Sequence, residues 1–304
     1  YGLDPAWKNI QDKLKENKEF NNTQFMQYSY RGFNKESVGE YSCQDTFNNE
    51  LKYNVSLLNL QITQYLKQHK NTDVYIVAHS LGGVVTFGMM AQLIANTHKN
   101  NFTDLGKPIG ALKGVAMLDS HLGGTIAEAW YDVGQIGKGL SCNLDPSAIT
   151  YKTISSLQEL FKNATSQTEQ GQTASLLKVL DGRDIPNQKV AEDAANAGVK
   201  ILVVGNENDL LWRPDVCGFS SNFLSTQYLK ELGDINNGNK GRLYSRSFTY
   251  PNREVSHEAD CANNEALLTH VLNLGFYHSD VLARTDVATA IWQTFTDRPL
   301  NQLS

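Results

Sequence analysis

Ser80 is the residue of this chain whose setting could make it a nucleophile. A β-branched run at 73–77 precedes it and a long apolar run follows from Leu81, so the pattern predicts a strand, a tight turn and a helix. At such a turn the hydroxyl projects away from the backbone, where a histidine can take its proton and the next N–H can meet an oxyanion. We therefore predict that Ser80 attacks acyl groups, rather than serving as a buried structural serine.

Small residues flank Ser80 on both sides. Ala78 stands two positions before it and Gly82 two positions after it. Both exclude bulk where the backbones of the strand and the helix must approach each other. The usual pattern at such a turn has glycine in the place of Ala78, so the surrounding strand and helix carry the assignment.

The bulk composition is that of a globular chain. Hydrophobic residues make up 40% and charged residues 19% of the 304 positions, and no apolar run approaches the roughly 20 residues that cross a bilayer. The net charge is −5 and the isoelectric point is near 5.8. Lys and Arg form no cluster that would give a basic face, so we expect no nucleic-acid partner.

The cysteines are even in number and include no Cys-x-x-Cys pair: Cys43, Cys142, Cys217 and Cys261. Their spacing to histidine is not that of a metal site, and we predict neither a metal nor a cofactor. Acceptor patterns for N-glycosylation begin at Asn21, Asn54, Asn101 and Asn163. Together these features favour a secreted, extracellular protein with one or two disulfides, of which Cys217–Cys261 is the preferred bridge.

Hydrophobic periodicity predicts helices alternating with strands. Helices are expected from Asp4 to about residue 14, at 51–66, after Ser80 and at 286–295. Strands are expected at 24–30, 73–77, 114–118, 199–204 and 243–250. Such alternation predicts an α/β fold with a mostly parallel sheet that is flanked by helices on both faces.

Four motifs in this order resemble those of the α/β-hydrolases, and within them lipase-like members. They lie at residues 78–83, 117–120, 203–211 and 278–282, in the order serine, acid, histidine of that family. Residues 117–125 are also similar to a segment of lipases and GPI inositol-deacylase-like hydrolases that usually carries Ser-Pro-Leu-Gly-Gly. His121 stands in the place of that proline, and we interpret it as a variant of a structural turn. The resemblance implies the α/β-hydrolase fold and ester hydrolysis.

Two acidic residues follow the strand at 199–204. A triad acid must lie at a strand end, where it can orient the histidine and stabilise its cationic form. Asp209 fits best, because Glu207 comes two residues earlier and would more readily point to solvent. The spacing from Gly205 to Asp209 is one residue longer than the commonest family pattern, so Glu207 stays open as the alternative.

Three late histidines could act as the general base. His270 lies in the apolar helical stretch 267–272 and is interpreted as a helix residue. His257 follows the last strand, on a loop that could face the serine. His278 ends a turn and precedes the helix at 286–295, where the resemblance implies the base. We predict His278, with His257 as the alternative.

Two backbone N–H groups should stabilise the oxyanion, and Leu81 supplies one. In the family the other comes from a loop that begins His-Gly, after a strand between those at 24–30 and 73–77, and this chain has no such strand. Residues 1–5 resemble the family's segment directly after His-Gly, which makes Tyr1 the second candidate donor. The chain opens on Tyr1 rather than methionine, so we expect that an N-terminal piece was removed. An upstream segment or a second chain should fill the gap in the middle of the sheet.

The roughly 80 residues between Ser120 and Val199 exceed a simple crossover. We predict a helical cap at 121–198 over an α/β-hydrolase core formed by 1–120 and 199–304. This cap would act as a lid, and its apolar stripes at 151–161 and 176–180 would contact acyl chains or a lipid interface. Ordinary packing on the core is the alternative.

The combined prediction is a secreted serine carboxyl-ester hydrolase, a lipase or esterase that acts on hydrophobic or lipid esters through Ser80, Asp209 and His278. An amidase or an acyltransferase would use the same groups. An alternative from another class is a noncatalytic binding protein that kept the fold, and the incomplete oxyanion loop is its support.

Overall fold

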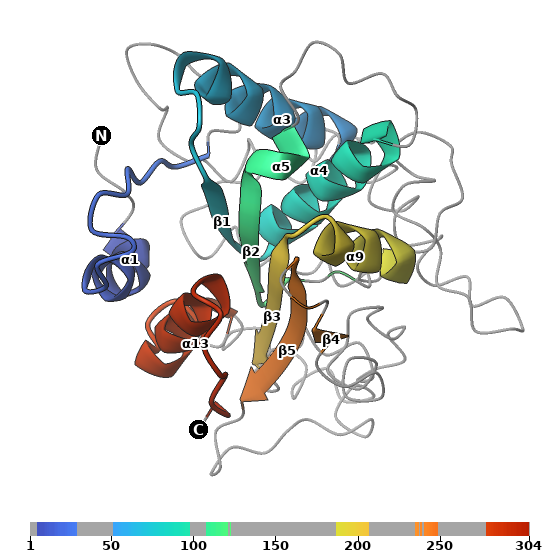
Figure 1. Ribbon diagram of the computed structural model, residues 1–304. Coiled ribbons are helices and arrows are strands. Elements are labelled where there is room, and N and C mark those ends of the chain that lie inside the picture. The colour runs from blue at the N-terminus through green and yellow to red at the C-terminus, as the bar shows by residue number, and fades with distance from the viewer. Residues whose placement is uncertain are drawn as a thin grey trace, which may run out of the picture.

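Five strands form one sheet in the computed structural model, which describes residues 5–28, 51–97, 108–120, 122, 187–206, 235–236, 238, 240–248 and 278–303. The strands are β1 (Val74–His79), β2 (Leu112–Leu118), β3 (Lys200–Asn206), β5 (Arg242–Phe248) and β4 (Ile235–Asn236), in that spatial order. The first four are parallel and β4 runs antiparallel to β5. The carboxyl ends of the four parallel strands therefore share one edge of the sheet (Figure 1).

The central strands are apolar on both faces, as strands of a sheet covered on both sides must be. Because side chains alternate along a strand, neighbouring residues enter different cores. In β2, Val115 and Met117 join one hydrophobic cluster, whereas Ala116 and Leu118 join the other. β3 divides in the same way. The predicted α/β fold is confirmed.

Helices α3 (Leu51–Gln68), α4 (Leu81–Thr97), α5 (Pro108–Ala111) and α9 (Asn187–Asn196) lie over one face of the sheet (Figure 1). α4 packs against β1 and β2 and is in turn contacted by α3 and α9. Its fully buried Phe87, Met89 and Met90 are the largest side chains that it contributes to this core. The predicted helices at 51–66 and after Ser80 are confirmed.

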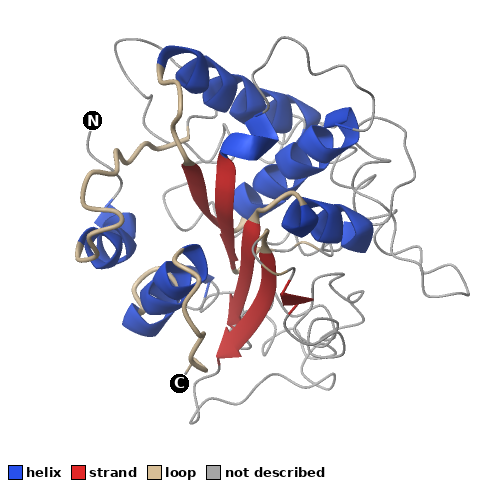
Figure 2. Ribbon diagram, in the orientation of Figure 1, coloured by secondary structure: helices blue, strands red, loops and turns tan. Residues whose placement is uncertain are grey.

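The other face is covered by α1 (Lys8–Lys15), preceded by the short helix η1 (Pro5–Trp7), and by α13 (Thr285–Phe295) (Figure 2). α1 buries Ile10 and Leu14, which lie four positions apart and therefore on one side of the helix. α13 packs against β2, β3 and α1. The predicted helices that begin near Asp4 and Asp286 are thus present.

The strand predicted at 24–30 is wrong for residues 24–28, which form no regular secondary structure. Side chains rather than a backbone ladder hold this segment: Tyr28 Oη donates to the carbonyl of Asn54 at 3.1 Å, and Tyr65 Oη to Gln24 Oε1 at 2.9 Å. Its apolar residues pack on the cores, which produced the strand-like pattern. Among the described residues, β1 is the outermost strand of the sheet and pairs only with β2. The gap that was expected in the middle of the sheet is not present among these strands.

Helix α9 was not predicted, although its signals are in the sequence. Pro186 precedes it, and Gly198, with φ +103°, follows it and ends it with a bond from its N–H to the carbonyl of Ala195. Its alanines gave little hydrophobic periodicity. α9 falls within the range assigned to the cap and packs on α4 and the sheet. Most of that range, 123–186, lies outside the described residues, so the cap stays a prediction.

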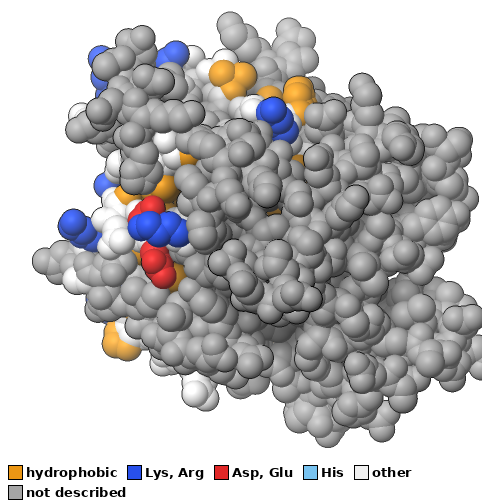
Figure 3. Space-filling model, turned by 90° about the vertical axis from the view of Figure 1, so that its right-hand side faces the viewer, with side chains coloured by type: hydrophobic (Ala, Val, Ile, Leu, Met, Phe, Trp, Pro, Cys, Tyr) orange, Lys and Arg blue, Asp and Glu red, His pale blue; other side chains and the backbone are white. Residues whose placement is uncertain are grey.

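The part of the surface that the described residues form carries charges of both signs. On the face shown in Figure 3, basic side chains adjoin acidic ones. Ion pairs such as Lys13–Glu16 and Arg298–Glu19, at 3.0 and 3.9 Å, have the same mixed character. Within the described ranges, no helix combines the length and the apolar character needed to span a membrane.

At Gly83, α4 lies very close to the carboxyl end of β2 and to Ser120, which follows it. A Cβ on Gly83 would overlap Ser120 Oγ and would lie 2.5 Å from Ser120 Cβ, and Ser120 is fully buried. A Cβ on Gly82 would meet Ala78 Cβ at 3.8 Å, an ordinary contact. The sequence pattern correctly brought Ala78 and Gly82 together, but the position that requires glycine is Gly83.

Gly83→Ala should therefore destabilise the protein by about 1–3 kcal/mol, because the added methyl group forces the helix away from β2. Gly82→Ala is the matched control one residue away. It should be neutral or stabilising by up to about 1 kcal/mol, because alanine favours the helix. Urea unfolding of both variants measures the difference. Equal stabilities for the two variants would show that this close approach does not constrain the fold.

Candidate active site

Ser80 occupies a strained turn between β1 and α4. Its φ is +54°, the left-handed region that costs a residue other than glycine about 1–2 kcal/mol. Two hydrogen bonds hold this backbone: the N–H of Ser80 donates to the carbonyl of Leu118 at 2.9 Å, and the N–H of Gly83 donates to the carbonyl of Ser80 at 3.0 Å. The predicted strand, turn and helix around Ser80 are confirmed. The conformation is the one that presents a serine hydroxyl above a sheet edge.

Leu81 is the first residue of α4. The first N–H groups of a helix have no acceptor within the helix, and the aligned peptide dipoles make this end partially positive. A negative oxygen formed next to Ser80 would meet that end of α4. The backbone N–H of Leu81 lies at this end of α4, and its side chain is buried. That this N–H stabilises an oxyanion stays a prediction.

His278 lies beside the serine turn. The Nε2 atom of His79, the last residue of β1, is 2.6 Å from the backbone carbonyl of His278. The centroids of the two imidazole rings are 4.6 Å apart, with the rings tilted by 42°. The fold thus brings the predicted base against the residue that precedes the predicted nucleophile, across 199 positions of sequence. That His278 accepts the proton of Ser80 stays a prediction.

Asp119 joins the ends of β2 and β3. It is fully buried, has φ +42°, and accepts a hydrogen bond at its Oδ1 from the N–H of Asn206 at 2.5 Å. Its own N–H donates to the carbonyl of Val204 at 2.8 Å. Asn206 ends β3, three positions before Asp209, so this carboxylate holds the start of the segment that carries the predicted acid. Asp119 lies in the motif at 117–120, but no role was predicted for it; an acidic residue directly after a buried strand was the available signal.

Several predicted residues lie outside the described ranges. They are Tyr1, His121, Glu207, Asp209, His257, His270 and the four cysteines. The acid of the triad, the second oxyanion donor and the Cys217–Cys261 bridge therefore stay predictions.

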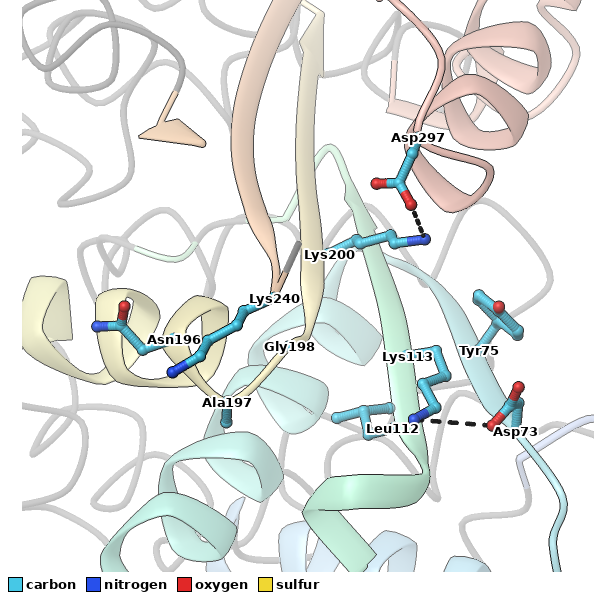
Figure 4. Close-up of a pocket in the computed structure, with 10 residues that line it drawn as sticks. All are labelled: Asp73, Tyr75, Leu112, Lys113, Asn196, Ala197, Gly198, Lys200, Lys240 and Asp297. Carbon is cyan, nitrogen blue, oxygen red and sulfur yellow. Dashed lines mark ion pairs between the residues drawn. The ribbon is translucent and has the colours of Figure 1, made fainter. Parts of the chain in front are cut away.

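A cavity of about 530 Å³ opens at the opposite edge of the sheet, where the strands begin. Figure 4 shows the three lysines on its wall pointing in different directions. Lys200 pairs with Asp297 at 2.7 Å and Lys113 lies 3.8 Å from Asp73. The cavity contains none of the predicted site residues, and its lysines do not converge on one point.

Asp280, two residues after His278, has a partly buried carboxyl group in an environment that disfavours its ionised form. Burial raises the pKa of its carboxyl above the ordinary value; Arg284 opposes this shift and Asp286 adds to it. Arg284 is engaged with Asp286, to which it donates two hydrogen bonds, at 2.9 and 2.5 Å. Among the described residues none donates a hydrogen bond to Oδ2 of Asp280. The ionised form of Asp280 is therefore less favourable in the folded protein than in water.

Comparison with known proteins adds little to this geometry. No known protein family matches the sequence, and no curated protein matches it significantly. A crystal structure of a serine hydrolase from the polyaromatic hydrocarbon-degrading bacterium Cycloclasticus zankles aligns with 90% of this chain and 85% of its own, at 14% identity and a TM-score of 0.32. A likeness this weak carries no argument about function. The chemistry of this site therefore has to be inferred from its own residues.

Asp119→Ala should cost about 2 kcal/mol of stability, because it leaves the buried N–H of Asn206 without this charged acceptor. Asp119→Asn keeps an oxygen that can accept the bond and should cost clearly less. Urea unfolding of both variants gives the comparison. An alanine variant as stable as the wild type would show that the contact does not hold the ends of β2 and β3.

Asp280→Asn should raise the melting temperature at pH 7 and leave it unchanged near pH 3. A raised pKa in the folded state means that the carboxyl lowers stability progressively as pH rises through that pKa, and has no effect below the ordinary value of about 3.9. Thermal unfolding between pH 3 and 7 measures both limits. A stabilisation that persists at pH 3 would contradict the electrostatic cause.

Proposed function

We propose that this protein is a serine hydrolase that cleaves carboxylic esters, with Ser80 as nucleophile, His278 as general base and Asp209 as the acid that orients it. The geometry at the carboxyl end of β1 carries the proposal. Ser80 is held at φ +54° at the carboxyl end of a parallel strand, and the backbone of His278 is bonded to the residue before it. A buried structural serine would not need a strained turn at a sheet edge.

The reaction that these groups support has two halves. The Oγ atom of Ser80 attacks the ester carbonyl carbon while His278 takes its proton, and the carbonyl oxygen becomes an oxyanion that the N–H of Leu81 stabilises. The tetrahedral intermediate then expels the alcohol, which receives the proton from His278, and leaves an acyl group on Ser80. Water, deprotonated by His278, attacks this acyl group. The second tetrahedral intermediate expels the Oγ atom of Ser80, which takes the proton back from His278, and the acid is released. Tyr1 is proposed as the second oxyanion donor.

The position of Ser80 at the start of α4 favours this chemistry. Negative charge develops on the substrate oxygen, and the amino-terminal end of a helix attracts it. Because β1 and β2 are held in register, with His79 opposite Leu118, this end of α4 does not have to reorganise when charge appears.

The proposed substrates are hydrophobic or lipid esters, in keeping with the apolar stripes at 151–161 and 176–180 of the proposed cap. The four cysteines and the four glycosylation patterns support a secreted protein. An upstream segment or second chain that supplies an oxyanion loop belongs to the same proposal.

A fluorophosphonate probe tests the nucleophile directly, because labelling requires an activated serine. The wild type should be labelled and Ser80→Ala should not. Hydrolysis of p-nitrophenyl esters from acetate to palmitate should fall by about 10⁴-fold or more in Ser80→Ala and strongly in His278→Ala. The profile over chain length separates an esterase from a lipase.

Ser120→Ala is a suitable control, because Ser120 is a second serine at the same sheet edge but is buried, with its Oγ bonded to the carbonyl of Leu118. It should keep labelling and hydrolysis. Ester hydrolysis that survives Ser80→Ala would contradict the mechanism. A folded wild type that neither reacts with the probe nor hydrolyses any ester or amide would favour the binding-protein alternative.

A further inference from the structure

The contact between His79 and His278 has a defined chemistry. A carbonyl oxygen can only accept a hydrogen bond, so at 2.6 Å the Nε2 atom of His79 must carry a proton and donate it. His79 uses the backbone of His278 for this bond and not a nitrogen of its imidazole. This bond therefore fixes the backbone position of His278 without using the imidazole of His278 as a partner.

Residues 278–280 are helical and residues 281–283 form a turn, and the two ends of this helical turn are held differently. Val281 and Leu282 are buried in the core beneath α13, and Asn9 donates to the carbonyl of Ala283 at 3.0 Å. His278 is at the other end of the turn and is half-buried. There the hydrogen bond from His79, together with the contact between the two rings, attaches the turn to the end of β1.

We propose that His79 is a positioning residue that fixes the backbone of His278 relative to Ser80. The effect of His79 on catalysis rests on the serine hydrolase function proposed above. His79 directly precedes Ser80 in the chain. Its hydrogen bond to His278 therefore fixes the position of the base relative to the nucleophile. Nucleophile and base must meet at about 3 Å, and an error of about 1 Å can cost up to about 100-fold in rate.

Two substitutions separate the hydrogen bond from the packing of the ring. His79→Phe keeps an aromatic ring beside His278 but has no donor. His79→Gln carries an amide N–H at about the reach of Nε2 and restores the donor. His69→Phe is the matched control. His69 also contacts a backbone carbonyl, that of Tyr65 at 3.1 Å, and its ring stacks on that of Tyr65. It lies directly after α3 and before β1, the strand that carries His79.

The kinetic readout is hydrolysis of p-nitrophenyl acetate together with the rate of fluorophosphonate labelling. His79→Phe should lower kcat and the labelling rate by about 10- to 100-fold with KM within about twofold. His79→Gln should recover most of this loss, and His69→Phe should match the wild type. A loss that glutamine does not recover would show that the hydrogen bond is not the cause, and unchanged rates in His79→Phe would overturn the proposal.

A second readout does not depend on activity. The amides of Leu282 and Ala283 donate within the turn, to the carbonyls of Ser279 and Asp280. Their hydrogen exchange should be faster in His79→Phe and close to wild type in His79→Gln. If the wild type shows no serine reactivity, the proposed function fails, and the exchange data alone decide whether His79 holds the turn. Exchange that is the same in all variants would overturn that role.

Discussion

The left-handed backbone of Ser80 is the constraint on which the rest of this edge of the molecule depends. A residue other than glycine adopts φ +54° only when its surroundings determine it, and here the carbonyl of Leu118 and the first turn of α4 do so. The hydrogen bonds require that β1, β2 and α4 meet within a very small space. Gly83 and the buried Ser120 show how small that space is, because it leaves no room for one more carbon.

That junction is possible because the sheet is parallel and buried on both faces. β2 and β3 divide their side chains between two cores, so helices can pack on each side without leaving apolar surface in water. The same arrangement sends the carboxyl ends of β1, β2, β3 and β5 to one edge. Asp119 then ties β2 to the end of β3, and His79 ties β1 to the turn that carries His278.

Two polar contacts made by buried or half-buried side chains organise this edge, in addition to the ion pair between Arg284 and Asp286. Each uses a side chain to fix a backbone group of a distant segment: the N–H of Asn206 and the carbonyl of His278. Such contacts orient loops with little freedom, because the backbone group itself is bound. The opposite edge differs, since its lysines and aspartates form partly exposed pairs that water screens.

The sequence by itself determined the local elements of this protein: the strand, turn and helix around Ser80, the amphipathic helices near both ends and the parallel character of the sheet, because periodicity and turn chemistry act over a few residues. It failed where tertiary contacts decide. Residues 24–28 look like a strand but are held by side chains, and α9 buries alanines that show little periodicity. Only the tertiary structure placed His278 beside His79 and Asp119 beneath Asn206, since these pairs are 199 and 87 positions apart and no local rule joins them.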